Sequence, residues 1–191
     1  MNGGDPIMLP SAPRGVLLIS GWRRAGKTTL LLRLREAALG AGLTVGGFLS
    51  PERSHNGEKV GIDLLDVATG ERVSLATVGG EGAVRTGHYT FDPAALDAGL
   101  RFARAGQDAD VYFVDELGPL ELVRGEGWAS VIPLIGARRS ADRGLSLVVV
   151  RPELIDAARQ RLDLPAGSPV VEINEATRQA LSAALEAWIS G

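Results

Sequence analysis

The stretch GVLLISGWRRAGKTTLLLRLREAAL, residues 15–39, decides the fold. Its first six residues are apolar and rich in branched side chains, as in a buried parallel strand. Residues 26–42 then carry leucine and alanine at helical spacing and end in glycines. Between them, GWRRAGKT fits the pattern G-x-x-x-x-G-K-[ST], in which backbone N–H groups and a helix N-terminus bind phosphate. The sequence therefore predicts a strand, a phosphate loop and a helix.

The residues of this loop have separate expected roles in nucleotide binding. Gly21 would make the turn out of the strand, and Gly26 would let the backbone approach the phosphates closely. Lys27 would reach the β and γ phosphates, and the hydroxyl of Thr28 would bind Mg²⁺. The predicted nucleotide-binding loop is Gly21, Trp22, Arg23, Arg24, Ala25, Gly26, Lys27 and Thr28.

The use of basic residues supports a function for Lys27. Only two of the twenty lysines and arginines are lysines, Lys27 and Lys59, and one of them lies in the loop. A compact ammonium fits among phosphate oxygens where a planar guanidinium is too bulky. For Arg23 and Arg24 at the tip, two interpretations stay open. One of them could stabilise the transferring phosphoryl group, or both could point into solvent.

A second apolar run, VYFVDE at 111–116, ends in two acids. Asp115 would lie at the carboxyl end of a buried strand, where parallel sheets form their ligand crevice, and its carboxylate would complete the magnesium shell. Glu116 would polarise a water in line with the γ phosphate as a general base. The alternative is that the pair merely ends a strand in solvent. Glu121, farther on, could hold the water or a loop, or be solvated.

The remaining pattern predicts an α/β fold of the P-loop type, with a mostly parallel, mixed central sheet and helices on both faces. Residues 60–67 and 71–78 flank a short turn and predict the antiparallel hairpin, at about 60–78, that makes the sheet mixed. The separation of Lys27 from Asp115 predicts at least one strand between the two strands that carry them. The other expected segments are strands at 43–50, 145–150 and 168–173, helices at 92–105, 152–162 and 174–189, one helix or two short ones at 125–139, and loops at 51–59 and 79–90.

Composition narrows the class of protein. Hydrophobic residues make up 45% and charged residues 23%, which is typical of a soluble globular domain. The net charge is −3 without a basic run, so we expect no nucleic-acid partner. The absence of cysteine excludes disulfides and thiolate chemistry, and two histidines argue against a histidine metal site. With no membrane-length apolar run, we expect a cytoplasmic monomer with a leader at 1–14 and one domain at 15–191.

Together, these motifs resemble the small P-loop nucleoside-triphosphatase family, also called cancer-related nucleoside-triphosphatase, over roughly residues 15–185. The likeness is carried by GGFLSPERSHNGEKVGIDLLD, RTGHYTFDPAAL, VDELGPLEL and EINEATRQAL, whereas the loop GWRRAGKT has less Gly and Pro than is usual in the family. The resemblance implies a Mg²⁺-dependent hydrolase that removes the terminal phosphate from ATP, GTP, CTP and UTP with little base preference. It assigns magnesium and water activation to Asp115 and Glu116. It assigns phosphate binding to Gly21, Gly26, Lys27, Thr28 and Thr29.

Other readings of the same motifs stay open. Glu52, Arg53 and His88 depart from the family pattern, and each could instead have an exposed structural role. A nucleotide or small-molecule kinase would need an arginine-bearing lid, for which GARRSADRG at 136–144 is the candidate. GW-x-x-x-GKTTLL also resembles GTP-binding adaptors of molybdopterin-guanine dinucleotide synthesis. No Asn-Lys-x-Asp motif is present, which argues against strict GTP specificity.

Overall fold

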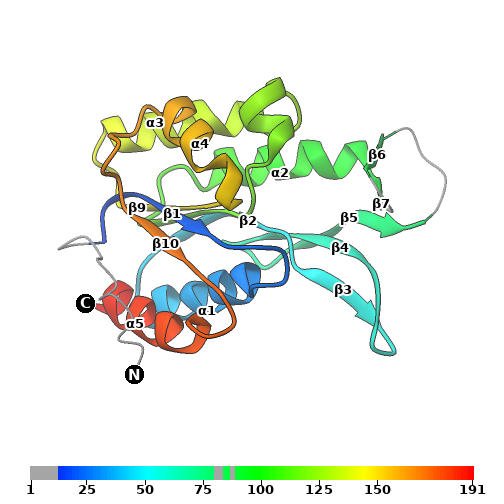
Figure 1. The fold of residues 1–191 in the computed structure, drawn as a ribbon, viewed down its shortest axis with the longest axis horizontal. Coiled ribbons are helices and arrows are strands. Elements are labelled where there is room, and N and C mark those ends of the chain that lie inside the picture. The colour runs from blue at the N-terminus through cyan, green and yellow to red at the C-terminus, as the bar shows by residue number, and fades with distance from the viewer. Residues whose placement is uncertain (1–12, 80–83, 87–88) are drawn as a thin grey trace.

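The computed structural model describes residues 13–79, 84–86 and 89–191, which form a ten-stranded sheet with helices on both faces (Figure 1). Five neighbouring strands run parallel and contain the strand that leads into the phosphate loop. Residues 1–12 of the leader predicted at 1–14 lie outside the described residues. In spatial order, the parallel strands are β10 (Val170–Glu172), β1 (Gly15–Ser20), β9 (Leu145–Val150), β8 (Val111–Val114) and β2 (Val45–Leu49).

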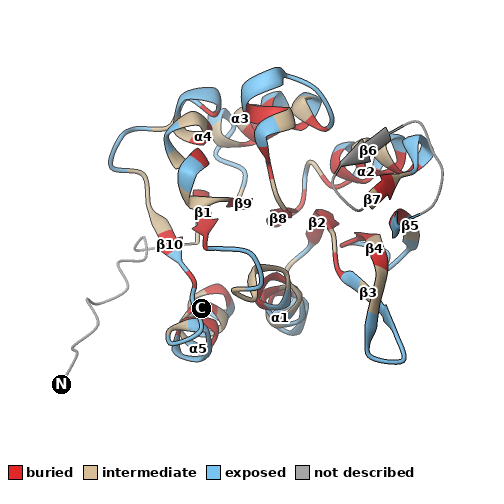
Figure 2. Ribbon diagram, turned by 45° about the vertical axis from the view of Figure 1, so that its right-hand side comes forward, coloured by how far each residue is buried: buried red, intermediate tan, exposed pale blue. Residues whose placement is uncertain are grey.

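The parallel strands are apolar on both faces because helices cover both sides of them. Strands β8 and β9 are buried along their whole length, as Figure 2 shows. Along β1, Leu17 and Ile19 pack in the core beneath α1 (Lys27–Gly40) and α5 (Arg178–Ser190). Leu18 faces the opposite core, against α2 (Pro93–Ala105), α3 (Ile132–Ser140) and α4 (Ile155–Arg161). The predicted helices on both faces are confirmed.

An antiparallel extension continues the sheet beyond β2. The predicted hairpin is present, as β4 (Glu58–Asp66) paired with β5 (Arg72–Val78). The prediction of loops at 51–59 and 79–90 was wrong, because they contain β3 (Glu52–His55), β6 (Val84–Thr86) and the start of β7 (Tyr89–Phe91). Strand β3 is largely exposed and pairs with β4 alone, so it has no buried face to impose an alternating apolar pattern.

Several helical boundaries also differ from the prediction. At 125–139 the second alternative, two short helices, is formed, as a 3₁₀ turn (Ala129–Val131) followed by α3, and a π-helical turn (Leu120–Arg124) precedes them. Another 3₁₀ turn (Pro152–Leu154) precedes α4. The closing helix begins at Arg178 rather than 174, because the Asn174 side chain accepts the N–H groups of residues 176 and 177 and closes a separate turn.

The sheet order brings the predicted site residues to one edge. Strand β9 lies between β1 and β8, which confirms the expected strand between the one that precedes Lys27 and the one that precedes Asp115. Because these strands are parallel, their carboxyl ends meet at the same edge. The phosphate loop follows β1, Asp115 follows β8 and Arg151 follows β9.

The 136–144 segment lies at the opposite edge of the sheet. It leads directly into β9, and the N–H of Gly15, at the start of β1, donates to the carbonyl oxygen of Gly144 at 2.8 Å. A segment at the amino ends of the strands cannot cover phosphates bound at their carboxyl ends. The expectation of a kinase lid here was therefore wrong.

Arg138 in this segment has a structural role. Its side chain is fully buried, with the guanidinium 4.8 Å from the centre of the Tyr112 ring. It donates to the carbonyl oxygens of Gln107, Ala109 and Arg143 and to the hydroxyl of Ser146. One arginine thus ties together the turns that precede β8 and β9, which sets where both strands begin.

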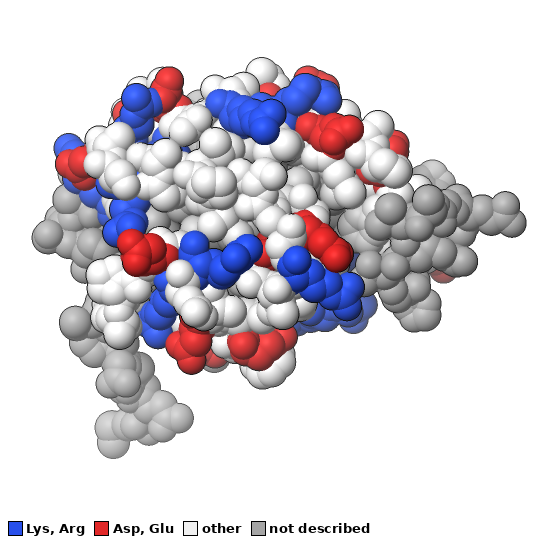
Figure 3. Space-filling model, turned by 90° about the horizontal axis from the view of Figure 1, so that it is seen from above, with Lys and Arg blue, Asp and Glu red and all other residues white. Residues whose placement is uncertain are grey.

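Charges are mixed on the face that carries α2, α3 and α4. Figure 3 shows lysine and arginine interspersed with aspartate and glutamate among the described residues of this face. This face therefore offers no continuous basic stripe for a nucleic-acid backbone. Within the described ranges, none of the helices has the length and apolar character needed to cross a membrane.

We expect Arg138→Ala to destabilise the fold by about 3–5 kcal/mol, because it leaves buried carbonyl groups without their donor. Arg139→Ala is the matched control, since Arg139 pairs with the exposed Asp163 and its loss should cost about 1 kcal/mol or less. Urea unfolding of both variants measures the difference. Equal losses of stability in the two variants would show that the buried hydrogen bonds of Arg138 contribute no more than the exposed ion pair of Arg139.

Candidate active site

The phosphate loop begins at a glycine that no other residue could replace without strain. Gly21 has φ +155°, and a Cβ at this position would lie 2.3 Å from the carbonyl oxygen of Ile173. The loop therefore passes directly beneath the end of β10. Gly26 has φ +97° and caps α1, and its carbonyl oxygen accepts the N–H of Leu30 at 2.9 Å. The strand, turn and helix predicted from residues 15–42 are thus formed.

Lys27 lies across the loop. Its ammonium donates to the carbonyl oxygens of Gly21 at 2.6 Å and Trp22 at 2.9 Å. Burial lowers the pKa of Lys27, while the negative charges of Glu116 and Asp115 act in the opposite direction. The ammonium therefore lies within electrostatic range of both predicted acids, as a phosphate-binding lysine requires.

The tip of the loop is open to solvent. Trp22, Arg23, Arg24 and Thr29 are exposed, and Arg24 adopts the left-handed backbone conformation at φ +64°. Neither arginine makes an ion pair with any of the described residues. Of the two interpretations left open by the sequence, this arrangement matches solvated side chains.

Asp115 is buried beside the start of α1. It is 3% exposed, its Oδ2 accepts the backbone N–H of Ser50 at 2.9 Å, and its carboxylate also hydrogen-bonds to the side chain of Thr28. Burial raises the pKa of Asp115 to about 6, although these hydrogen bonds and the charge of Lys27 oppose the rise. The neighbouring charge of Glu116 adds to the rise. Asp115 is therefore harder to ionise than an exposed aspartate.

These groups fit a magnesium ion. The Thr28 hydroxyl and the Asp115 carboxylate are hard oxygen donors side by side, and the buried Ser50 hydroxyl beside them has no hydrogen-bond partner among the described residues. No group of three or more acids and histidines that could hold a metal occurs within the described residues. A magnesium ion held by few protein ligands suits a phosphate site, where phosphate oxygens and waters complete its shell.

Glu116 points in another direction from Asp115. It has φ +75°, an uncommon conformation for a residue with a side chain. Its Oε1 accepts a hydrogen bond from Nε of Arg151 at 2.7 Å and forms an ion pair with Nη2 at 2.6 Å. The chain then returns to the sheet, where the N–H of Leu117 donates to the carbonyl oxygen of Val149 at 2.9 Å.

Sequence analysis missed Arg151 as a site residue. A weak signal was present, because Arg151 is the first residue after the buried run LSLVVV, in the same position that Asp115 has after its own strand. It also missed Arg178, at the start of α5, whose Cδ lies 4.0 Å from where a Cβ on Gly26 would be. The position of each arginine near the phosphate loop depends on which strands and helices are neighbours in the fold, and the sequence alone does not give this.

The remaining candidate residues have structural contacts. Glu121 is buried, and its carboxylate accepts the N–H groups of Gly118 at 2.9 Å and Trp128 at 3.2 Å, so it holds a loop. Glu52 pairs with Lys59 at 2.7 Å. Arg53 pairs with a carboxylate of β4, in the antiparallel extension, at 2.8 Å. His88 lies outside the described residues.

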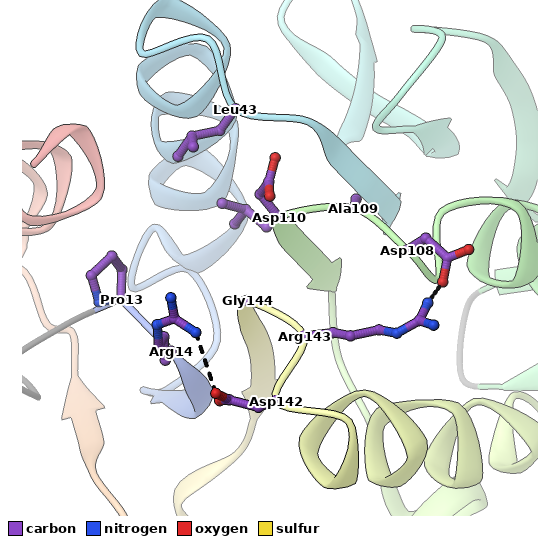
Figure 4. A pocket seen from close by; sticks show the side chains of 10 residues that line it. Pro13, Arg14, Leu43, Asp108, Ala109, Asp110, Asp142, Arg143 and Gly144 are labelled. Carbon is purple, nitrogen blue, oxygen red and sulfur yellow. Dashed lines mark hydrogen bonds and ion pairs between the residues drawn. The ribbon is translucent and has the colours of Figure 1, made fainter.

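A cavity of about 630 Å³ lies at the other edge of the sheet, where β1, β8 and β9 begin (Figure 4). Four of its charged groups form ion pairs, Arg14 with Asp142 and Arg143 with Asp108, and Asp110 accepts hydrogen bonds from Thr44. The cavity is therefore remote from the phosphate loop and has compensated charges. It is not the candidate active site.

Comparison with known proteins agrees with this geometry. A family model described as NTPase matches residues 16–184. The nucleoside-triphosphatase THEP1 of Ignicoccus hospitalis is 42% identical over 56% of this chain and 60% of that protein. The THEP1 of Methanothermobacter thermautotrophicus is 32% identical over 78% of this chain and 83% of that protein.

Two solved structures share the fold. A human cancer-related nucleoside triphosphatase has a TM-score of 0.66 and 22% identity, covering 90% of this chain and 95% of that chain. THEP1 from Aquifex aeolicus has a TM-score of 0.60 and 17% identity, covering 89% of this chain and 96% of that chain. At these identities the likeness establishes the α/β architecture.

We expect Asp115→Asn to raise the stability of the protein, measured without nucleotide or magnesium, at pH 8. The folded pKa of about 6 exceeds the unfolded value of about 3.9, so ionised Asp115 destabilises the fold by up to about 3 kcal/mol above pH 6. This cost grows from about pH 4 to pH 6 and vanishes below pH 4, where both states are protonated. Urea unfolding at pH 4 and pH 8 measures it.

The control is Asp110→Asn, for which the sign is opposite. Hydrogen bonds from Thr44 lower the pKa of Asp110, so its ionised form stabilises the fold above about pH 4 and this contribution is lost on acidification. Asp110→Asn should therefore lose stability at pH 8. A stability loss in Asp115→Asn at pH 8 would contradict the assignment of a strained buried charge.

Proposed function

The chain belongs to the NTPase family, and from this premise we propose that it is a Mg²⁺-dependent nucleoside-triphosphate phosphohydrolase, which converts NTP and water to NDP and phosphate. The observation that carries the proposal is the convergence of three groups at one sheet edge. Lys27 lies within electrostatic range of Asp115 and Glu116, beside a glycine-rich turn that opens a helix. The catalytic domain would be residues 15–191 of a cytoplasmic monomer.

Phosphate binding follows from the loop. The turn from Gly21 to Gly26 presents backbone N–H groups at the start of α1, where the helix dipole favours negative charge. Lys27 would exchange its two carbonyl partners for β and γ phosphate oxygens, and the loop residues through Thr29 would line the phosphates. Because one helix turn carries both Lys27 and Thr28, phosphate and metal binding are coupled.

Thr28 and Asp115 would hold the magnesium ion, which offsets the negative charge of the phosphates when bound. The nearby Ser50 hydroxyl would hydrogen-bond to the shell of the ion. Magnesium would remove the destabilisation of ionised Asp115, since the cation supplies the missing positive charge. The raised pKa of Asp115 implies that protons compete with magnesium below about pH 6.

Hydrolysis then needs a base for water. We assign this role to Glu116, whose carboxylate lies beside Asp115 but outside its hydrogen bonds. The water oxygen would attack the γ phosphorus while its proton passes to Glu116. The bond from phosphorus to the bridging oxygen breaks, and NDP leaves with that electron pair.

Broad base preference is the proposal that the chain best supports. The sequence lacks the Asn-Lys-x-Asp motif that reads guanine, and all the assigned groups act on phosphate or metal. ATP, GTP, CTP and UTP should therefore all be substrates. The arginine-bearing lid that a kinase would need is not formed by the 136–144 segment, because this segment lies at the other edge of the sheet.

We expect the protein to release phosphate from all four nucleoside triphosphates with Mg²⁺, and to lose this activity in EDTA. Glu116→Gln should lower kcat by about 10²–10⁴-fold, because the amide cannot accept the proton of water, while ATP binding persists. Glu126→Gln is the matched control, since Glu126 is exposed and near none of the site residues in sequence. Phosphate release and calorimetric ATP binding measure both effects.

Equal turnover in the wild-type protein and Glu116→Gln would overturn the assignment of the base. Tight ATP binding with no hydrolysis by the wild-type protein would instead favour a nucleotide-binding adaptor. ADP formation only in the presence of a second substrate would favour a phosphoryl transferase.

A further inference from the structure

The ion pair between Arg151 and Glu116 joins two strands at the phosphate edge. The hydrogen bond from Nε and the ion-pair contact of Nη2 are both made with the same oxygen, Oε1 of Glu116. The two side chains are 32% and 42% exposed, so the pair is open to a ligand from solvent. The guanidinium thus engages an oxygen of the very carboxylate that water would need as its base.

The register of the sheet places Arg151 directly beside the phosphate loop. Ser20 of β1 pairs with Val150 of β9, so the next residues, Gly21 and Arg151, lie side by side where the strands end. Pairing of Val114 with Val148 places Glu116 on the other side of the same strand end. The backbone of Arg151 therefore lies between the phosphate loop and Glu116, the proposed base.

Arg151 and Lys27 share one electrostatic environment. The positive charge of Arg151 contributes to lowering the pKa of Lys27, and Glu116 contributes to raising it. Both cations are bound to protein acceptors, Lys27 to loop carbonyls and Arg151 to Glu116. A γ phosphate beside Lys27 would offer Arg151 an acceptor with more negative charge than one carboxylate.

We propose that Arg151 is the arginine supplied in cis to the γ phosphate, and that Glu116 holds it until a triphosphate takes its place. The inference rests on the proposed hydrolysis. On NTP binding, the guanidinium leaves Oε1 for γ phosphate oxygens, which frees Glu116 to accept the proton of water. Arg151 stays protonated throughout and stabilises charge on the transferring phosphoryl group. A diphosphate offers no γ oxygen, so it leaves the pair intact.

The exchange distinguishes Arg151 from the arginines at the loop tip. Arg23 and Arg24 belong to the phosphate loop itself, but both are exposed and without an ion pair within the described part of the chain. Arg151 follows a fully buried strand, and its guanidinium already has an oriented partner. Less side-chain entropy is therefore lost when it binds phosphate.

The test compares triphosphate and diphosphate binding by calorimetry, with ATP and ADP in Mg²⁺. In Glu116→Gln, hydrolysis is suppressed and the competing charge is removed, so ATP should bind several-fold more tightly than to the wild-type protein, with ADP unchanged. Adding Arg151→Ala should weaken ATP binding by about tenfold and ADP binding by less than about twofold. Arg101→Ala, an exposed arginine of α2, should change neither.

Turnover supplies the second readout. Arg151→Ala alone should lower kcat at least about 100-fold, the order expected for a phosphate-contacting arginine, and Arg151→Lys should recover part of it. Unchanged or raised turnover in Arg151→Ala would overturn the proposal. So would a fall in turnover with an unchanged ratio of ATP to ADP affinity, which would make Arg151 only a support for Glu116.

The two proposals can fail separately. If the wild-type protein releases no phosphate, hydrolysis fails, but the ratio of ATP to ADP affinity still tests the arginine. Circular dichroism and urea unfolding of each variant identify a loss caused by misfolding. If the wild-type protein has no turnover, the affinity ratio of a folded Arg151→Ala variant supports or overturns the inference.

Discussion

The pairing of β9 between β1 and β8 is the constraint on which the site depends. Parallel hydrogen bonding fixes the register of all three strands, so their carboxyl ends project three different groups toward one place. The loop after β1 supplies a glycine turn and Lys27, β8 supplies the two acids, and β9 supplies Arg151. If another strand lay between any two of them, the groups on those two strands would be farther apart by one more strand spacing, about 4.8 Å.

Buried charges are compensated by protein groups at one edge of the sheet and only partly compensated at the other. At the amino edge, Arg138 is buried but its guanidinium is surrounded by carbonyl oxygens, and Asp110 has hydrogen bonds that lower its pKa. These charges are compensated within the protein, and they fix where strands begin. At the carboxyl edge, burial of Asp115 raises its pKa, so a bound cation would stabilise its ionised form. The first edge stabilises the fold, and the second is suited to a ligand.

Much of the site could be predicted because its signals are local. Gly21, Gly26, Lys27 and Thr28 lie in one short pattern between a strand and a helix, and Asp115 ends a run of buried residues. An inserted strand was predicted from the residues between Lys27 and Asp115, but the strand that takes this place is β9, which follows both residues in the chain. Exposed elements were missed, such as β3, since an exposed strand needs no apolar alternation. Arg138 was misassigned to a lid because sequence gives a charge but not the edge at which it lies.

The sequence by itself determined the phosphate loop, the acids after the second buried strand and the α/β layering, because each is encoded in neighbouring residues whose spacing sets strand, turn or helix. Only the tertiary structure decided which arginine meets Glu116, the proposed base. Arg151 and Glu116 are separated by a helix and a strand along the chain, and they meet because parallel pairing aligns the ends of β8 and β9. Register is a property of the assembled sheet, and no local pattern around either residue records it.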